Sequence, residues 1–159
     1  MTILRCAALR ASAPDDHEGE SITLSKRDAA EFADYVKHLA VRMRLAEYDP
    51  LIMPHACEGG YLAEVETDFS YHTIRIALCP GFHVMSPTRK RTTLVHELLH
   101  AHAYVMKVPY EALEDELARG VWATTESTAM KHEEHVVTSM ESAFAQFMPL
   151  PPKIERRRK

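Results

Sequence analysis

Hydrophobic residues change their spacing along the first half of the chain. Over 32–43 they recur at intervals of three and four in an otherwise polar stretch, which predicts a helix over 26–46. Over 61–66 and 72–78 apolar and polar residues alternate, which predicts two strands that pair antiparallel. A third strand is expected over 51–56, after Pro50 has broken the helical pattern. These segments together indicate a helix followed by a small antiparallel sheet.

The second half of the chain predicts helices. Ser86 is a typical N-cap residue and Pro87 suits the first helical position, so we expect a helix over 88–106. A short helix should follow over 109–119 and stop at Gly120, because glycine is common just past a helix end.

A long last helix should occupy 127–148, since no helix breaker occurs there before Pro149. The inward residues of the last two helices are expected to be Leu113, Leu117, Val137, Met140, Phe144 and either Phe147 or Met148. The whole pattern predicts one α+β domain over 23–150, preceded by a loose arm over 1–22 and followed by a tail over 151–159.

Composition and charge exclude several classes of protein. Three cysteines without a Cys-x-x-Cys unit indicate neither a disulfide framework nor a thiolate zinc site. No apolar run reaches the roughly 18 residues of a membrane span, so we expect a cytoplasmic protein without a membrane partner. The net charge of −4 divides into +4 over 151–159 and −8 over the rest of the chain. This basic tail has no aromatic residues, so it predicts at most weak, nonspecific contact with nucleic acid.

One motif carries candidate chemistry. His96-Glu97-Leu98-Leu99-His100 is an H-E-x-x-H sequence inside the helix expected over 88–106. Residues four apart in a helix lie one turn apart on the same face, so His96 and His100 can bind one zinc ion. Glu97 would then be the catalytic general base that acts on a zinc-bound water. Even with ten histidines in the chain, chance gives only about 0.06 such sequences, which favours a real site.

A catalytic zinc site of this kind has three protein ligands, and the third must come from another segment. The segment over 132–135, His-Glu-Glu-His, offers four candidates at the start of the last helix's apolar face. Glu134 and Glu133 lie three and four residues before Val137, so either can share its side of the helix. One of the two glutamates is the expected ligand.

These features resemble the minimal zincins, gluzincin-like metallopeptidases that include the ImmA/IrrE-type peptidases and small predicted metallopeptidases of bacteriophages. The resemblance spans about 26–149 and rests on three features: the motif helix preceded by Arg-Thr-Thr-Leu-Val, a distal helix with Glu-Glu-x-Val-Val, and a closing Met-Pro. It implies a zincin-like fold, Zn²⁺ as cofactor, hydrolysis of a protein or peptide substrate, and host cytoplasm if a phage encodes the chain. In the ImmA-type pattern the ligand precedes a small apolar residue by three, which favours Glu134, with Glu133 as the alternate.

Two other interpretations stay open. Similarity to SprT-type proteases would make His132 or His135 the third ligand, although the Cys-rich zinc ribbon common in that family is missing here. A non-catalytic binding protein could also keep a zincin fold with a structural zinc, but Glu97 favours an enzyme. In zincins the substrate commonly adds a strand to a sheet edge, here expected over 72–78. The candidates for an oxyanion donor are Tyr104, Tyr110, His102 and His135.

Overall fold

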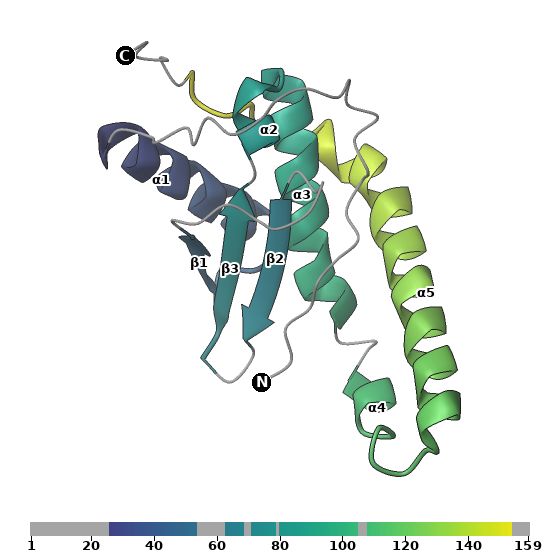
Figure 1. Ribbon diagram of the computed structural model, residues 1–159. Coiled ribbons are helices and arrows are strands. Elements are labelled where there is room, and N and C mark those ends of the chain that lie inside the picture. Colours follow the sequence, from purple (N-terminus) through teal and green to yellow (C-terminus); the bar gives the residue numbers. More distant parts are fainter. Residues whose placement is uncertain (1–25, 54–62, 69–70, 79, 105–107, 154–159) are drawn as a thin grey trace.

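Figure 1 shows the computed structural model of the protein, which describes residues 26–53, 63–68, 71–78, 80–104 and 108–153. Its elements are α1 (Lys26–Arg42), β1 (Asp49–Ile52), β2 (Ala63–Asp68), β3 (Thr73–Leu78), α2 (Pro80–Val84), α3 (Pro87–Ala103), α4 (Val108–Glu111) and α5 (Arg119–Ala145). Predictions that concern 1–25, 54–62 and 154–159 lie outside these residues. The described part of the chain is α+β, as the hydrophobic pattern predicted.

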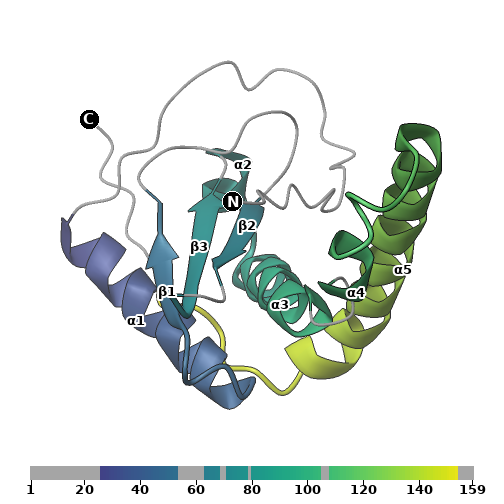
Figure 2. The same ribbon diagram turned by 90° about the horizontal axis from the view of Figure 1, so that it is seen from below.

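The helices form layers on one side of the sheet. α1 and α3 pack on the same face of the sheet, and α5 lies along α3 on the side away from α1 (Figure 2). The centre of the core is made by Phe32, Val36, Leu39, Ile74, Ile76, Phe82, Leu94, Leu98 and Leu99. None of the described helices is both long and apolar enough to cross a membrane. α3 is the central helix, because the sheet, α1 and α5 all pack against it.

The sheet is mixed rather than antiparallel, and this corrects the prediction. β2 and β3 pair antiparallel as expected, with Val65 opposite Ile76. β1, however, pairs parallel with β3, and the strand order is β1-β3-β2. Alternation of apolar and polar residues shows which faces of a strand are buried but carries no information on strand order. β3 is therefore the central strand, and the expected substrate edge over 72–78 is paired on both sides.

α1 ends four residues earlier than predicted. Arg44 adopts the left-handed conformation with φ of 62°, and the Leu45 amide donates to the Ala40 carbonyl over 2.9 Å. This arrangement closes a helix end and turns the chain back, so that Leu45 is buried. The prediction extended to 46 because no glycine or proline interrupts the sequence between the last apolar position of the helix and Pro50.

α3 begins where the sequence predicted. Ser86 is extended and its hydroxyl accepts from the Arg89 amide over 3.3 Å, while Pro87 occupies the first helical position. The described helix runs to Ala103 with Tyr104 as its C-cap, and the predicted end at 106 lies outside the described residues. The prediction of a helix that carries the H-E-x-x-H sequence is confirmed.

The predicted boundaries of the last two helices are wrong. α4 covers only Val108–Glu111, and α5 begins at Arg119 instead of 127 and ends at Ala145 instead of 148. Gly120, the predicted stop, lies in the first turn of α5, where its φ is not positive. Glycine is permissive in either conformation, so it marks a helix end only where the left-handed region is used.

The predicted inward face of the last helix is confirmed only in part. Val137 is buried, and Met148, one of the two alternatives for the last position, is partly buried against the core. Met140 and Phe144, however, are 36% and 39% exposed, and Phe147 is 73% exposed. Leu113, before the helix, is 43% exposed as well. α5 lies chiefly against one neighbour, α3, and the buried residues of the helix are Ala129, Glu133, Val137 and Ala145. A helix that packs on a single helix buries only a narrow stripe.

Candidate metal centre

α3 places the H-E-x-x-H residues inside the protein. The helix is buried without interruption from Thr93 to Ala101, because the sheet, α1 and α5 cover it on different sides. His96, Glu97 and His100 are each no more than 2% exposed. Ionisable side chains are seldom buried so completely unless they are paired or bind an ion. The burial therefore excludes a solvated helix face for these three residues.

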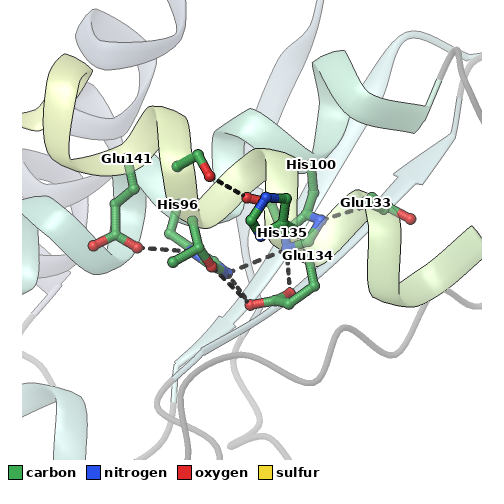
Figure 3. A network of polar contacts seen from close by, with 8 residues as sticks. His96, His100, Glu133, Glu134, His135 and Glu141 are labelled. Carbon is green, nitrogen blue, oxygen red and sulfur yellow. Dashed lines mark hydrogen bonds and ion pairs between the residues drawn. The ribbon is translucent and has the colours of Figure 1, made fainter.

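α5 brings three glutamates to the two histidines (Figure 3). Glu134 and Glu141 are seven residues apart, which is close to two helical turns, so they lie on the same face of α5. Glu133 precedes Glu134 and approaches His100 from the other side. The carboxylate of Glu134 also accepts from the Thr138 hydroxyl over 3.3 Å, which helps to orient it.

His96, His100 and Glu134 form a group whose ligand atoms all lie within 4.8 Å of one another. The two Nε2 atoms are 3.3 Å apart. Glu134 Oε1 lies 3.5 Å from His96 Nε2, and its Oε2 lies 3.6 Å from His100 Nε2. Two histidines from one helix and a carboxylate from another therefore converge on a single point.

The other nitrogen of each imidazole has its own carboxylate. His96 Nδ1 is 2.8 Å from Glu141 Oε2, and His100 Nδ1 is 2.9 Å from Glu133 Oε1. Because an ionised carboxylate only accepts hydrogen bonds, both Nδ1 atoms must be the donors. In a neutral imidazole this leaves Nε2 unprotonated, with its lone pair directed to the common point.

The donor set fits a metal ion. When both imidazoles are neutral, two nitrogen lone pairs and two carboxylate oxygens face one another, and a cation between them would stabilise this arrangement. Neutral imidazole and carboxylate are also the usual ligands of divalent transition metals. The chemistry of the residues at this point therefore matches a bound cation, and His96, His100 and Glu134 could hold it.

The alternative ligands occupy other positions. Glu133 is bound to His100 Nδ1, so its carboxylate supports a histidine instead of joining the group. His132 and His135, the ligands implied by a SprT-type arrangement, are exposed, and neither belongs to the described group.

Three of the candidates for an oxyanion donor, Tyr104, His102 and Tyr110, lie at or near the C-terminal end of α3 and on α4. Tyr104 donates to Glu111 Oε2 over 2.7 Å, and its pKa is raised to about 12, first by burial and then by that hydrogen bond. His102 is exposed and its Nε2 lies 2.6 Å from the Met43 carbonyl, toward the end of α1. Tyr110 is 40% exposed.

Glu141 was not foreseen from the sequence. One signal could have found it: Glu134, Val137 and Glu141 recur at intervals of three and four, so all three share one helix face. The apolar residues around Val137 predict an apolar face, and Glu141 lies on that face two turns beyond Glu134, the predicted ligand.

Comparisons with models of protein families, with curated proteins and with solved structures find no match for the chain.

Proposed function

We propose that the protein is a zinc-dependent metallopeptidase of the minimal zincin type. His96, His100 and Glu134 are the zinc ligands, and Glu97 is the general base. The observation that carries the proposal is the convergence of the three ligand side chains, with their Nε2 atoms 3.3 Å apart. Two nitrogens bound to one tetrahedral zinc at about 2.0–2.1 Å lie about 3.3–3.4 Å apart, so the side chains are spaced for this ion.

The other acidic residues of the site support catalysis by accepting protons or hydrogen bonds. His96, His100 and Glu134 would hold the zinc ion, which would lower the pKa of a bound water to about 7 and polarise a substrate carbonyl. Glu97, adjacent to His96 and fully buried, takes the water proton and passes it to the leaving amine. By accepting from Nδ1, Glu133 and Glu141 would leave Nε2 of each neutral imidazole available to the zinc. Three ligands leave one position for water and substrate.

The position of the substrate is proposed along β2 instead of β3. β2 packs on α3, the helix that carries the motif, and no described strand pairs with its second edge. An extended peptide can add to such an edge through main-chain hydrogen bonds. Peptides methylated on single backbone nitrogens test this: KM should rise only at alternate positions, and equal turnover of all the methylated peptides would argue against strand addition.

The experiment that tests the function is the Glu97→Gln variant, compared with Glu47→Gln, an exposed glutamate outside the site. Hydrolysis of dye-labelled casein and the zinc content of each protein are measured together. Glu97→Gln should retain zinc and lose at least ~10²-fold in rate, because it removes only the general base. Glu47→Gln should match the wild type, and a chelator should abolish hydrolysis until zinc is restored. Unchanged hydrolysis by Glu97→Gln would contradict the assigned role.

A zincin-fold protein that binds zinc without catalysis would give a different result. The wild type would then hold one zinc yet hydrolyse neither casein nor a mixed peptide library. The buried position of Glu97 favours the enzyme, because burying a carboxylate costs free energy and a general base next to the metal gives that burial a function.

A further inference from the structure

The segment that follows α5 is tied to two other helices. Arg91, near the start of α3, donates from Nη1 to the Met148 carbonyl over 3.1 Å. Tyr35 of α1 donates its hydroxyl to the Pro149 carbonyl over 2.8 Å. Pro151 is buried just beyond, and Met148 packs against the core. The chain leaving α5 thus crosses toward α1 with two consecutive carbonyls bound (Figure 2).

The two donors lie close to each other as well as to the segment. The positive charge of Arg91 acts on the Tyr35 phenol, where it opposes the large rise in pKa caused by burial. Arg91 forms no ion pair with a carboxylate among the described residues. Its guanidinium is therefore placed for the carbonyls of this segment and not for an acidic partner.

α5 needs such a connection because its own face attaches it only weakly. The buried residues of this 27-residue helix are two alanines, one valine and Glu133. Three of its larger apolar residues, Met130, Met140 and Phe144, are more than a third exposed, whereas Trp122 near its start is partly buried. Ala118, at the N-cap position, provides no side-chain hydrogen bond to fix the start of the helix. Apolar burial along a narrow stripe leaves the rotation and the axial position of a helix poorly defined.

The site depends on that position. Glu134 and Glu141 meet His96 and His100 only if α5 keeps one rotation and one height along α3. Glu141 lies four residues before Ala145, the last helical residue, which is about 6 Å along the axis at about 1.5 Å per residue. The tether at Met148 and Pro149 lies seven and eight residues beyond Glu141, and the chain between them is helical as far as Ala145.

We infer that Arg91 and Tyr35 are positioning residues that set α5 against α3 through the carbonyls of Met148 and Pro149, and so hold Glu134 and Glu141 at the two histidines. This inference rests on the proposed function, because it assigns the pair a role in metal binding. It also gives a physical reason for the Met-Pro sequence that closes the domain. Proline at 149 restricts the backbone, so the two carbonyls are presented with little conformational freedom.

The test uses the full chain with Arg91→Met and Tyr35→Phe, singly and combined. Arg89→Met and Tyr71→Phe are matched controls, since both residues are exposed and Arg89 lies on the same helix. Zinc affinity is measured by competition with a chromophoric chelator, and the geometry of the ligands by the visible absorption of the Co²⁺-loaded protein. Hydrogen exchange over 130–145 is followed in the metal-free protein, with 93–101 of α3 as the internal reference.

The combined variant should lose about 10–100-fold in zinc affinity, the effect expected when groups that orient metal ligands are removed. Its Co²⁺ absorption should weaken, and exchange over 130–145 should accelerate while 93–101 stays protected. Arg91→Lys, which keeps a donor, should recover most of the affinity. The controls should match the wild type. If the combined variant does not fold, Tyr35→Phe alone, which removes a single oxygen atom, should still give a loss of several-fold.

Two results would overturn the inference while the proposed function stands. One is a lower free energy of unfolding with zinc affinity within about twofold of the wild type, since an anchor that positions ligands must change their affinity. The other is unchanged exchange over 130–145. If instead the wild type binds no zinc, or Glu134→Ala does not weaken binding, the proposed function fails and the inference fails with it.

Discussion

Two neighbouring glutamates of α5 occupy different places at the site, so replacing each with alanine should have different effects. Glu133 is 8% exposed and accepts from His100 Nδ1 over 2.9 Å. Glu133→Ala leaves that buried N–H without its partner, at a cost of about 1–3 kcal/mol. Because each 1.4 kcal/mol is about tenfold in affinity, zinc binding should weaken by about 10–100-fold.

Glu134→Ala removes a proposed ligand, so its effect should exceed that range, with more than ~100-fold loss of zinc affinity. Its carboxylate is 31% exposed, and its oxygens lie 3.5 and 3.6 Å from the two Nε2 atoms. Partial exposure makes the substitution milder for the fold than that of Glu133, which is buried. Glu134→Ala should therefore lose more zinc affinity than Glu133→Ala but less free energy of unfolding.

Competition with a chromophoric chelator at neutral pH measures the affinities, and denaturant unfolding measures the stabilities. Glu126→Ala, a half-buried glutamate eight residues earlier on α5, is the control and should bind zinc like the wild type. A larger affinity loss in Glu133→Ala than in Glu134→Ala would refute the assignment and make Glu133 the ligand. Equal binding by all the variants would place any zinc elsewhere.

Three further results are expected. Glu141→Ala should weaken zinc binding by about 10–100-fold and Glu141→Gln by less than ~10-fold, because the amide oxygen still accepts from His96 Nδ1; equal losses in a chelator competition would point to the charge instead. Leu98→Ala should lower the free energy of unfolding by about 2–5 kcal/mol, since this side chain is fully buried, and a denaturant titration that gives less than ~1 kcal/mol would contradict the packing. Above pH 10.0, the ordinary pKa of a tyrosine, stability should fall as the pH rises toward about 12, because the raised pKa values of Tyr35 and Tyr104 let the folded state keep protons that the unfolded chain releases. Tyr35→Phe should flatten this decline in unfolding curves recorded across that range, and an unchanged slope would exclude Tyr35 as its source.

The sequence predicted those parts of the site that depend on local geometry. An N-cap at Ser86 and a proline at 87 define the start of α3, and a spacing of four places His96 and His100 on one face. Glu134 joins them in the structure, as the resemblance favoured. That this group binds zinc stays a prediction.

The parts of the fold and site that the sequence did not predict depend on how helices and strands pack against one another. The order β1-β3-β2 is set by tertiary packing, and the same alternating pattern would suit either edge. Which glutamate of α5 reaches His96 depends on how that helix lies along α3. The sequence alone does not distinguish Glu141, which contacts His96, from Glu126, which does not belong to the site. The hydrogen bonds from Arg91 and Tyr35 are accepted by backbone carbonyls, which every residue has. A pattern of side chains in the sequence therefore does not predict these bonds.

A crystal structure with anomalous data collected at the zinc edge would show whether the three side chains bind the metal. We expect one strong peak between His96 Nε2, His100 Nε2 and the Glu134 carboxylate, with Glu133 and Glu141 still bound to the Nδ1 atoms. The peak should be lost in crystals of Glu134→Ala grown under the same conditions. A zinc ion bound by His132 or His135, or no peak at this point in protein supplied with zinc, would contradict this assignment.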